Sequence, residues 1–129
     1  MKKLIASGLA LACLASLAGC SSKMTLSIAE ANKIELCSGN NGTMVEVMDE
    51  EDIMYITDNI NGLRFSKGSS SKDSTGWRYW LKWYDSENNL MEEMVVMSEY
   101  EIDYKNYFYT SVEADAKIDL LFLDELLGN

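Results

Sequence analysis

Apolar and polar residues alternate with a period of two along much of the chain after residue 33, and this pattern predicts β-strands. Ile34 and Leu36 form the first alternating run, and Val45 and Val47 form the second. The Asn-Gly pair between the runs tolerates the positive φ angles of a tight turn, so together they predict a β-hairpin. Further strands are predicted at residues 64–67, 77–84, 91–97, 100–104 and 106–112.

A spacing of three, four and three residues replaces the alternation after the hairpin. It places four apolar residues on one face of a helix, namely Ile53, Ile56, Ile60 and Leu63. Asp49 is a suitable N-cap, and the acidic residues 50–52 suit the positive end of the helix dipole. Gly62 lies near the expected C-terminal end. This segment is therefore predicted as a central helix.

The last apolar run, residues 118–127, predicts a terminal helix that Asp115 or Asp119 caps and Gly128 closes. Two strands, a helix, a series of strands and a final helix indicate an α+β fold. We expect an antiparallel β-sheet of about five or six strands, with the central and the C-terminal helix packed on one face. Residues 33–129 are predicted to form this single domain.

The N-terminus has the pattern of a secretory signal peptide. Two lysines precede an apolar stretch, residues 4–17, which is shorter than the roughly 20 residues that a membrane-spanning helix needs. The following Leu17-Ala18-Gly19-Cys20 resembles the bacterial lipobox. This resemblance implies cleavage after residue 19 and a diacylglyceryl group on the Cys20 thiol. An ordinary signal peptide with an incidental cysteine and an uncleaved anchor helix are the alternatives.

The resemblance to a lipobox predicts a protein anchored by lipid on the extracytoplasmic face of the cell membrane. Acyl chains then hold the protein, because two or three of them bind stably where one does not. Residues 20–32 show no firm period and are predicted to form a tether between membrane and domain. Whether the envelope is Gram-positive or Gram-negative stays open at this point.

The charge balance excludes one class of partner. The chain has 11 basic and 21 acidic residues, and Lys2 and Lys3 leave with the signal peptide. Nucleic acid is not expected as a ligand, because phosphate binding needs clustered basic side chains. The net negative charge also argues against a domain lying flat on anionic lipid. It is compatible with simple solubility, with a cationic partner or with calcium.

The chain lacks histidine, which excludes Ser-His-Asp triads, Cys-His pairs and histidine-based metal sites. Cys37 would be the one unmodified cysteine of the processed chain, so no disulfide forms within it; we predict a small buried apolar residue. Carboxylates remain as candidates for a small hydrolase, but acid pairs arise by chance in so acidic a chain. We therefore expect no enzyme and no cofactor.

Asp85-x-Glu87-x-Asn89 resembles the start of a calcium loop. Leu90 then stands where the loop needs glycine, and Val96 where it needs a bidentate acid. A hairpin turn is the better interpretation, and no metal site is expected.

The strand predicted at residues 77–84 provides the one specific hypothesis about ligand binding. Alternation places Trp77, Tyr79, Leu81 and Trp83 on a core face. The opposite face then holds Arg78, Trp80, Lys82 and Tyr84. Aromatic rings beside cationic groups can stack on sugar rings or hold a peptide. Alternatively, Trp80 lies under the polar loop of residues 68–76, or between Arg78 and Lys82 on a packed second face.

The hydrophobic pattern over residues 33–127 resembles a group of small, largely uncharacterised lipoproteins from Firmicutes. The shared features are the helix start at residues 49–53, the aromatic strand at 77–85 and the segment at 118–120. The resemblance implies an extracytoplasmic domain of a Gram-positive cell and no particular activity. We expect a non-enzymatic module that binds a protein or a wall polymer; the alternative is glycan or peptidoglycan recognition through the aromatic face.

Overall fold

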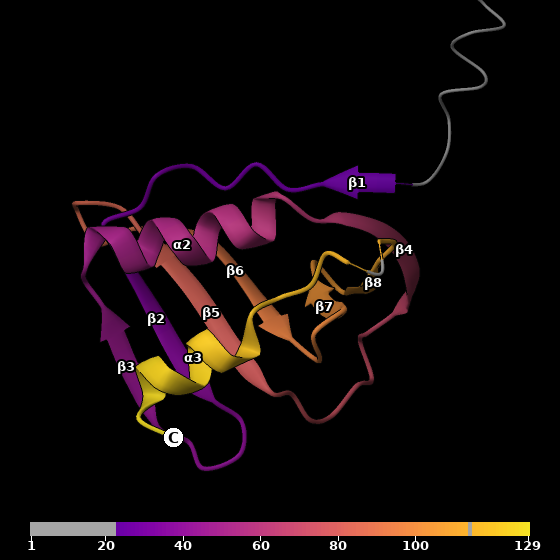
Figure 1. The fold of residues 1–129 in the computed structure, drawn as a ribbon. Helices are drawn as coiled ribbons and strands as arrows, with labels where there is room; N and C mark the ends of the chain where they lie inside the picture. The colour runs from indigo at the N-terminus through magenta and orange to yellow at the C-terminus, as the bar shows by residue number, and fades with distance from the viewer. Residues whose placement is uncertain (1–22, 114) are drawn as a thin grey trace, which may run out of the picture.

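The protein forms one eight-stranded antiparallel sheet with two helices, in a computed structural model that describes residues 23–113 and 115–129 (Figure 1). The elements in chain order are β1 Lys23–Thr25, β2 Lys33–Ser38, β3 Met44–Val47, α2 Glu50–Asn61, β4 Arg64–Ser70, β5 Tyr79–Tyr84, β6 Leu90–Val96, β7 Glu101–Tyr104, β8 Tyr107–Ser111 and α3 Leu120–Leu127. The predicted signal peptide, residues 1–19, and the lipidation site Cys20 lie outside the described residues.

The sheet confirms the predicted α+β class but corrects the number of strands. The strands lie in the order β1-β4-β8-β7-β6-β5-β2-β3, and every neighbouring pair is antiparallel. Eight strands replace the expected five or six. The turn between β7 and β8 separates two strands that were predicted individually, and in it Lys105 and Asn106 have φ angles of 50° and 71°. Two successive positive φ angles make a tight hairpin turn. The strand that no predicted segment accounts for is β1.

The eighth strand, β1, comes from the segment that was predicted to be a tether. Lys23–Thr25 pairs with residues 64–66 of β4. Leu26 and Ile28, which follow β1 in the chain, are buried. The Ile28 N–H donates to Asn61 Oδ1 at 2.9 Å, and Asn61 Nδ2 donates to the Ile28 carbonyl at 3.0 Å. The tether prediction is therefore wrong from residue 23 onward, because two apolar side chains and a paired backbone fix this segment to the domain.

Helix α2 begins and ends where the sequence predicts. The Asp49 side chain accepts a hydrogen bond from the Asp52 N–H at 3.1 Å, as an N-cap does. Gly62 forms the C-cap. The apolar face predicted from the three-and-four spacing is buried. The local sequence was sufficient to predict this helix because its capping residues and its apolar face indicate the same boundaries.

Helix α3 is two residues shorter at its start than predicted. Asp119, one of the two proposed caps, accepts from the Phe122 N–H at 3.1 Å, so the helix begins at Leu120. Gly128 adopts the left-handed conformation, with φ 79°, and terminates the helix. At 12 and 8 residues, neither helix of the described part is long and apolar enough to cross a membrane.

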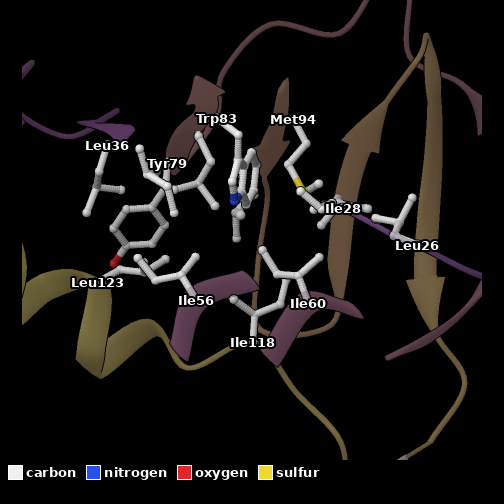
Figure 2. Close-up of a cluster of buried hydrophobic side chains, with 14 of the residues drawn as sticks. Leu26, Ile28, Leu36, Ile56, Ile60, Tyr79, Trp83, Met94, Ile118 and Leu123 are labelled. Carbon is white, nitrogen blue, oxygen red and sulfur yellow. The ribbon is translucent and has the colours of Figure 1, made fainter. Parts of the chain in front are cut away.

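The core lies beneath the helices, against one face of β5 (Figure 2). Figure 1 shows α2 and α3 crossing in front of β2 and β5. Trp83 Nε1 of β5 donates to Thr57 Oγ1 of α2 at 2.9 Å, and the Tyr79 hydroxyl donates to the Asp124 carboxylate of α3. Tyr79, Leu81 and Trp83 are 2%, 0% and 0% exposed. The predicted core face of the aromatic strand is confirmed at these three residues.

Candidate functional site

The opposite face of the sheet, called here the outer face, carries the side chains that alternate with the buried ones. Cross-strand pairing sets Met44, Cys37, Trp80 and Val95 in one row across β3, β2, β5 and β6. Met44 is 57% exposed and Trp80 is 37% exposed. An apolar row therefore crosses four strands of an otherwise charged face, with Trp80 as its largest member.

Trp80 is held in place by three contacts. Its ring packs against the edge of Trp77, with the ring centroids 5.8 Å apart at 78°. Its Nε1–H donates to Glu93 Oε2 at 3.3 Å. Lys82 Nζ lies 4.6 Å from the centroid of the ring. One alternative predicted from the sequence placed Trp80 between Arg78 and Lys82. The structure has the contact with Lys82, and more than a third of Trp80 remains exposed.

Arg78 does not lie with Trp80, contrary to simple alternation. The backbone bends at Arg78, and β5 begins one residue later. Its guanidinium carbon lies 5.8 Å from the Tyr79 ring centroid. Arg78 lines a separate pocket of about 550 Å³ together with Lys117 and Asp124, beside α3. Of the four predicted binding residues, the structure brings together Trp80, Lys82 and Tyr84 on β5.

Tyr84 occupies the far end of the same strand face, and its hydroxyl is already engaged. It donates to Glu35 Oε1 on the neighbouring strand β2 at 2.6 Å, and Lys33 Nζ lies 4.6 Å from the ring centroid. This hydrogen bond is the largest cause that raises the pKa of Tyr84 to about 12. Tyr84 therefore stays a neutral donor over the physiological range.

A shallow hollow of about 480 Å³ lies beside Trp80. Its lining mixes the carboxylates Glu93 and Asp103 with Lys105, Asn106 and the apolar residues of β6. Asp103 Oδ1 accepts from the Ser71 hydroxyl at 2.5 Å. An aromatic ring next to oxygen acceptors and an ammonium donor can contact a ligand that has both an apolar face and hydroxyl groups.

Cys37 corrects another prediction. It is half-buried rather than buried, because it points to the outer face directly across from Trp80. Its Sγ lies 3.9 Å from the carbonyl oxygens of Ser38 and Gly42.

The turn between β5 and β6 has the hydrogen bonds of a hairpin. Asp85 Oδ1 accepts from the Glu87 and Asn89 N–H groups at 2.9 and 2.8 Å. The bond from the Asn89 backbone is the largest cause that lowers the pKa of Asp85. Asn88 adopts φ 65° within the turn. The hairpin interpretation is confirmed. Across residues 23–113 and 115–129, no group of three or more Cys, Asp or Glu side chains is arranged to hold a metal.

A second hollow, of about 420 Å³, lies between residues 28–32 and α2 and was not predicted from the sequence. Its lining includes the exposed Met48 and Met54 together with Glu30, Glu50 and Asp58. The sequence gives no signal for it, because one wall is formed by the segment that was expected to be a tether.

The chain matches no family model, no curated protein and no solved structure in the three comparisons with known proteins. The resemblance to small lipoproteins of Firmicutes therefore stays a prediction, and the functional argument depends on the geometry of the outer face.

Proposed function

We propose that this protein is a lipid-anchored, extracytoplasmic binding module that recognises a cell-wall glycan through the outer face around Trp80. One observation carries the proposal: Trp80 is 37% exposed beside a hollow of about 480 Å³. The core is filled by Trp83 and Tyr79, so Trp80 is not needed to complete it. In this proposal both helices cover the opposite face of the sheet, and the outer face is left free for a ligand.

The chemistry around Trp80 favours a sugar over a flat protein surface. A pyranose ring has an apolar face that stacks on an aromatic ring and hydroxyl groups that hydrogen-bond at its edge. Glu93 and Asp103 supply oxygen acceptors at the hollow, and Lys105 supplies a donor. Lys82, with its ammonium 4.6 Å from the ring centroid, limits access to the ring and would move or add a hydrogen bond when a sugar binds.

The anchor part of the proposal depends on Cys20. Lipid on its thiol would keep the domain at the outer surface of the cell membrane, close to wall polymer. The test is the fractionation of cells producing the wild type or Cys20→Ser, with mass spectrometry of the N-terminal peptide. We expect a diacylglyceryl group and membrane association for the wild type alone. That the protein has no catalytic activity stays a prediction.

The binding part is tested by co-sedimentation of the chain from Cys20 onward, with Cys20→Ser, and purified cell wall. Wild type and a Trp80→Ala variant are compared with Tyr107→Ala as a matched control. Tyr107 is 38% exposed, and Lys67 Nζ lies 3.9 Å from its ring centroid, so its setting is similar to that of Trp80. It pairs with the buried Tyr104 and therefore faces the core side of the sheet.

We expect the wild type and Tyr107→Ala to pellet with the wall, and Trp80→Ala to stay in solution. If Trp80→Ala pellets as well as the wild type, the outer face is not the binding surface. If none of the three pellets, wall binding is wrong, and a protein partner becomes the leading candidate.

A further inference from the structure

The basic residues are distributed very unevenly over the fold. Residues 23–29 and 59–72 contain four basic residues and no acidic one. These two segments contain β1 and β4, which pair at one edge of the sheet. The rest of the described chain carries five basic residues and all 21 acidic residues. We call the four cations Lys23, Arg64, Lys67 and Lys72 the basic edge.

Lys23, Arg64 and Lys67 lie where β1 pairs with β4, close to the N-terminal end of the domain. Lys72 follows the other end of β4, where the Ser71 N–H donates to the Asn106 carbonyl of the β7–β8 turn. Lys23 lies opposite Ser66, and Thr25 lies opposite Arg64, so Lys23 and Arg64 project from the same face of adjacent strands. All four side chains are exposed. Arg64 forms a salt bridge of 3.5 Å with Glu113, and both partners are about half exposed. Such a pair is weak in water, so Arg64 remains able to bind another anion.

The length of chain before β1 limits how far this edge can lie from a membrane. Cys20 precedes Lys23 by three residues, which span about 10 Å at most when extended. The tether expected from the sequence, residues 20–32, would have reached about 45 Å. Because Lys23 already belongs to the sheet, a lipid on Cys20 holds the β1 side of the domain against the headgroups.

We propose that the basic edge docks on anionic phospholipid headgroups and fixes the orientation of the domain on the membrane. This inference rests on the lipid anchor proposed above. Charges interact strongly within a Debye length of about 8–10 Å, so the cations nearest the surface act while the more distant acids are screened. The acidic remainder is repelled and disfavours other orientations. In this orientation β3, at the opposite edge of the sheet, points away from the membrane.

The proposal revises the expectation that so acidic a chain avoids anionic lipid. That expectation follows from the net charge, which is −10 for the full chain and −12 once Lys2 and Lys3 leave with the signal peptide. The surface potential near a membrane depends on the groups within the first Debye length, and there the basic edge determines its sign.

The test attaches the domain chemically, so that it does not depend on lipidation in the cell. The chain from Cys20 onward, with Cys37→Ser, is coupled through the Cys20 thiol to a maleimide lipid in phosphatidylglycerol-rich vesicles. The acetylation rate of each lysine is measured by mass spectrometry, with and without coupling. Lys23 is close to the lipid in every orientation, so Lys67 and Lys72 are the informative residues. Lys82, on the outer face of β5, is the internal control.

We expect coupling to slow the acetylation of Lys67 and Lys72 by at least threefold and to leave Lys82 unchanged. Phosphatidylcholine vesicles or 0.5 M salt should remove most of this protection. In Arg64→Glu/Lys67→Glu, Lys72 should lose its protection. Lys33→Glu/Arg78→Glu makes the same charge change on β2 and just before β5, which β6, β7 and β8 separate from β4, and it should retain the protection.

Equal protection of Lys72 and Lys82 on phosphatidylglycerol vesicles would overturn the proposed orientation. Protection that is the same on phosphatidylcholine vesicles would overturn the role of headgroup charge. Neither result depends on whether cells lipidate Cys20, which the N-terminal mass spectrum decides separately.

Discussion

Two tryptophans on strand β5 stand three residues apart in very different environments. Trp83 is 0% exposed, and its indole N–H donates to Thr57 Oγ1, which is also buried. Trp80 is 37% exposed, and its indole N–H donates to the exposed carboxylate of Glu93. The alternation of side chains along the strand sends the first ring to the core and the second to the outer face.

The comparison separates side chains that stabilise the fold from side chains that are available to bind a ligand. A buried indole contributes through its apolar area and must have a hydrogen-bond partner inside, because water cannot reach it. An exposed indole can exchange its carboxylate partner for water or for a ligand at little cost. We therefore expect substitutions on the core face of β5 to unfold the protein, and substitutions on the outer face to change binding.

The largest effect is expected for Trp83→Ala. Removing a large buried aromatic side chain leaves a cavity in the core, which costs about 3–5 kcal/mol of unfolding free energy. Urea denaturation followed by circular dichroism measures it. A loss below about 1 kcal/mol, a small value for a buried large-to-small change, would show that Trp83 does not support the core as the structure indicates.

Thr57→Val is expected to have an intermediate effect. Valine keeps the shape of threonine but removes the acceptor of the Trp83 indole N–H, and an unsatisfied buried donor costs about 1–3 kcal/mol. The same urea titration measures this loss. Thr110→Val on the exposed surface of β8 is the matched control, and a surface change of this kind should stay within about 0.5 kcal/mol. Equal losses in the two variants would contradict the role of the Thr57 hydroxyl.

Trp80→Ala should destabilise the protein less than either core variant. It removes the edge contact with Trp77, and an aromatic pair of this kind contributes about 0.5–1.5 kcal/mol. The urea midpoint should therefore move slightly, while wall binding is lost in the co-sedimentation test. A loss of stability as large as that of Trp83→Ala would show that Trp80 belongs to the core.

The smallest effect is expected in the pH dependence of Tyr84. Its pKa is raised from 10.0 to about 12, with the hydrogen bond to Glu35 as the largest cause. A pKa raised on folding means that the stabilising contribution is complete below pH 10 and is lost as the pH rises toward 12. Glu35→Gln should lower the pKa of Tyr84 toward 10, as measured by phenolate absorbance at 295 nm against Tyr84→Phe. Glu87→Gln, in the β5–β6 turn, should leave the titration unchanged.

The elements predicted correctly are those whose information is local. Asp49 and Gly62 bound α2 because capping depends on side chains within a few residues of the helix end. The buried face of β5 follows from alternation alone, and Asp85 forms its turn through bonds to residues two and four positions away. For the outer face, alternation correctly grouped Trp80, Lys82 and Tyr84.

The elements predicted wrongly depend on partners far away in the sequence. Leu26 and Ile28 lie in a segment with no recognisable period, and β1 is defined by its pairing with β4. Arg78 was assigned to the outer face, but the backbone bends there and its side chain lies near Tyr79 and α3. The hollow beside Trp80 combines residues of β5, β6 and β7, whose register no local pattern specifies.

The sequence by itself determined the α+β class, the position of α2 with its caps and the alternation that separates Trp83 from Trp80. These features depend on interactions within a few residues. The tertiary structure alone decided that residues 23–28 belong to the domain, that Cys37 lies beside Trp80 and that four cations gather at one edge of an acidic protein. Each of these depends on strand pairing between distant segments, where the energy comes from contacts that the local sequence does not contain.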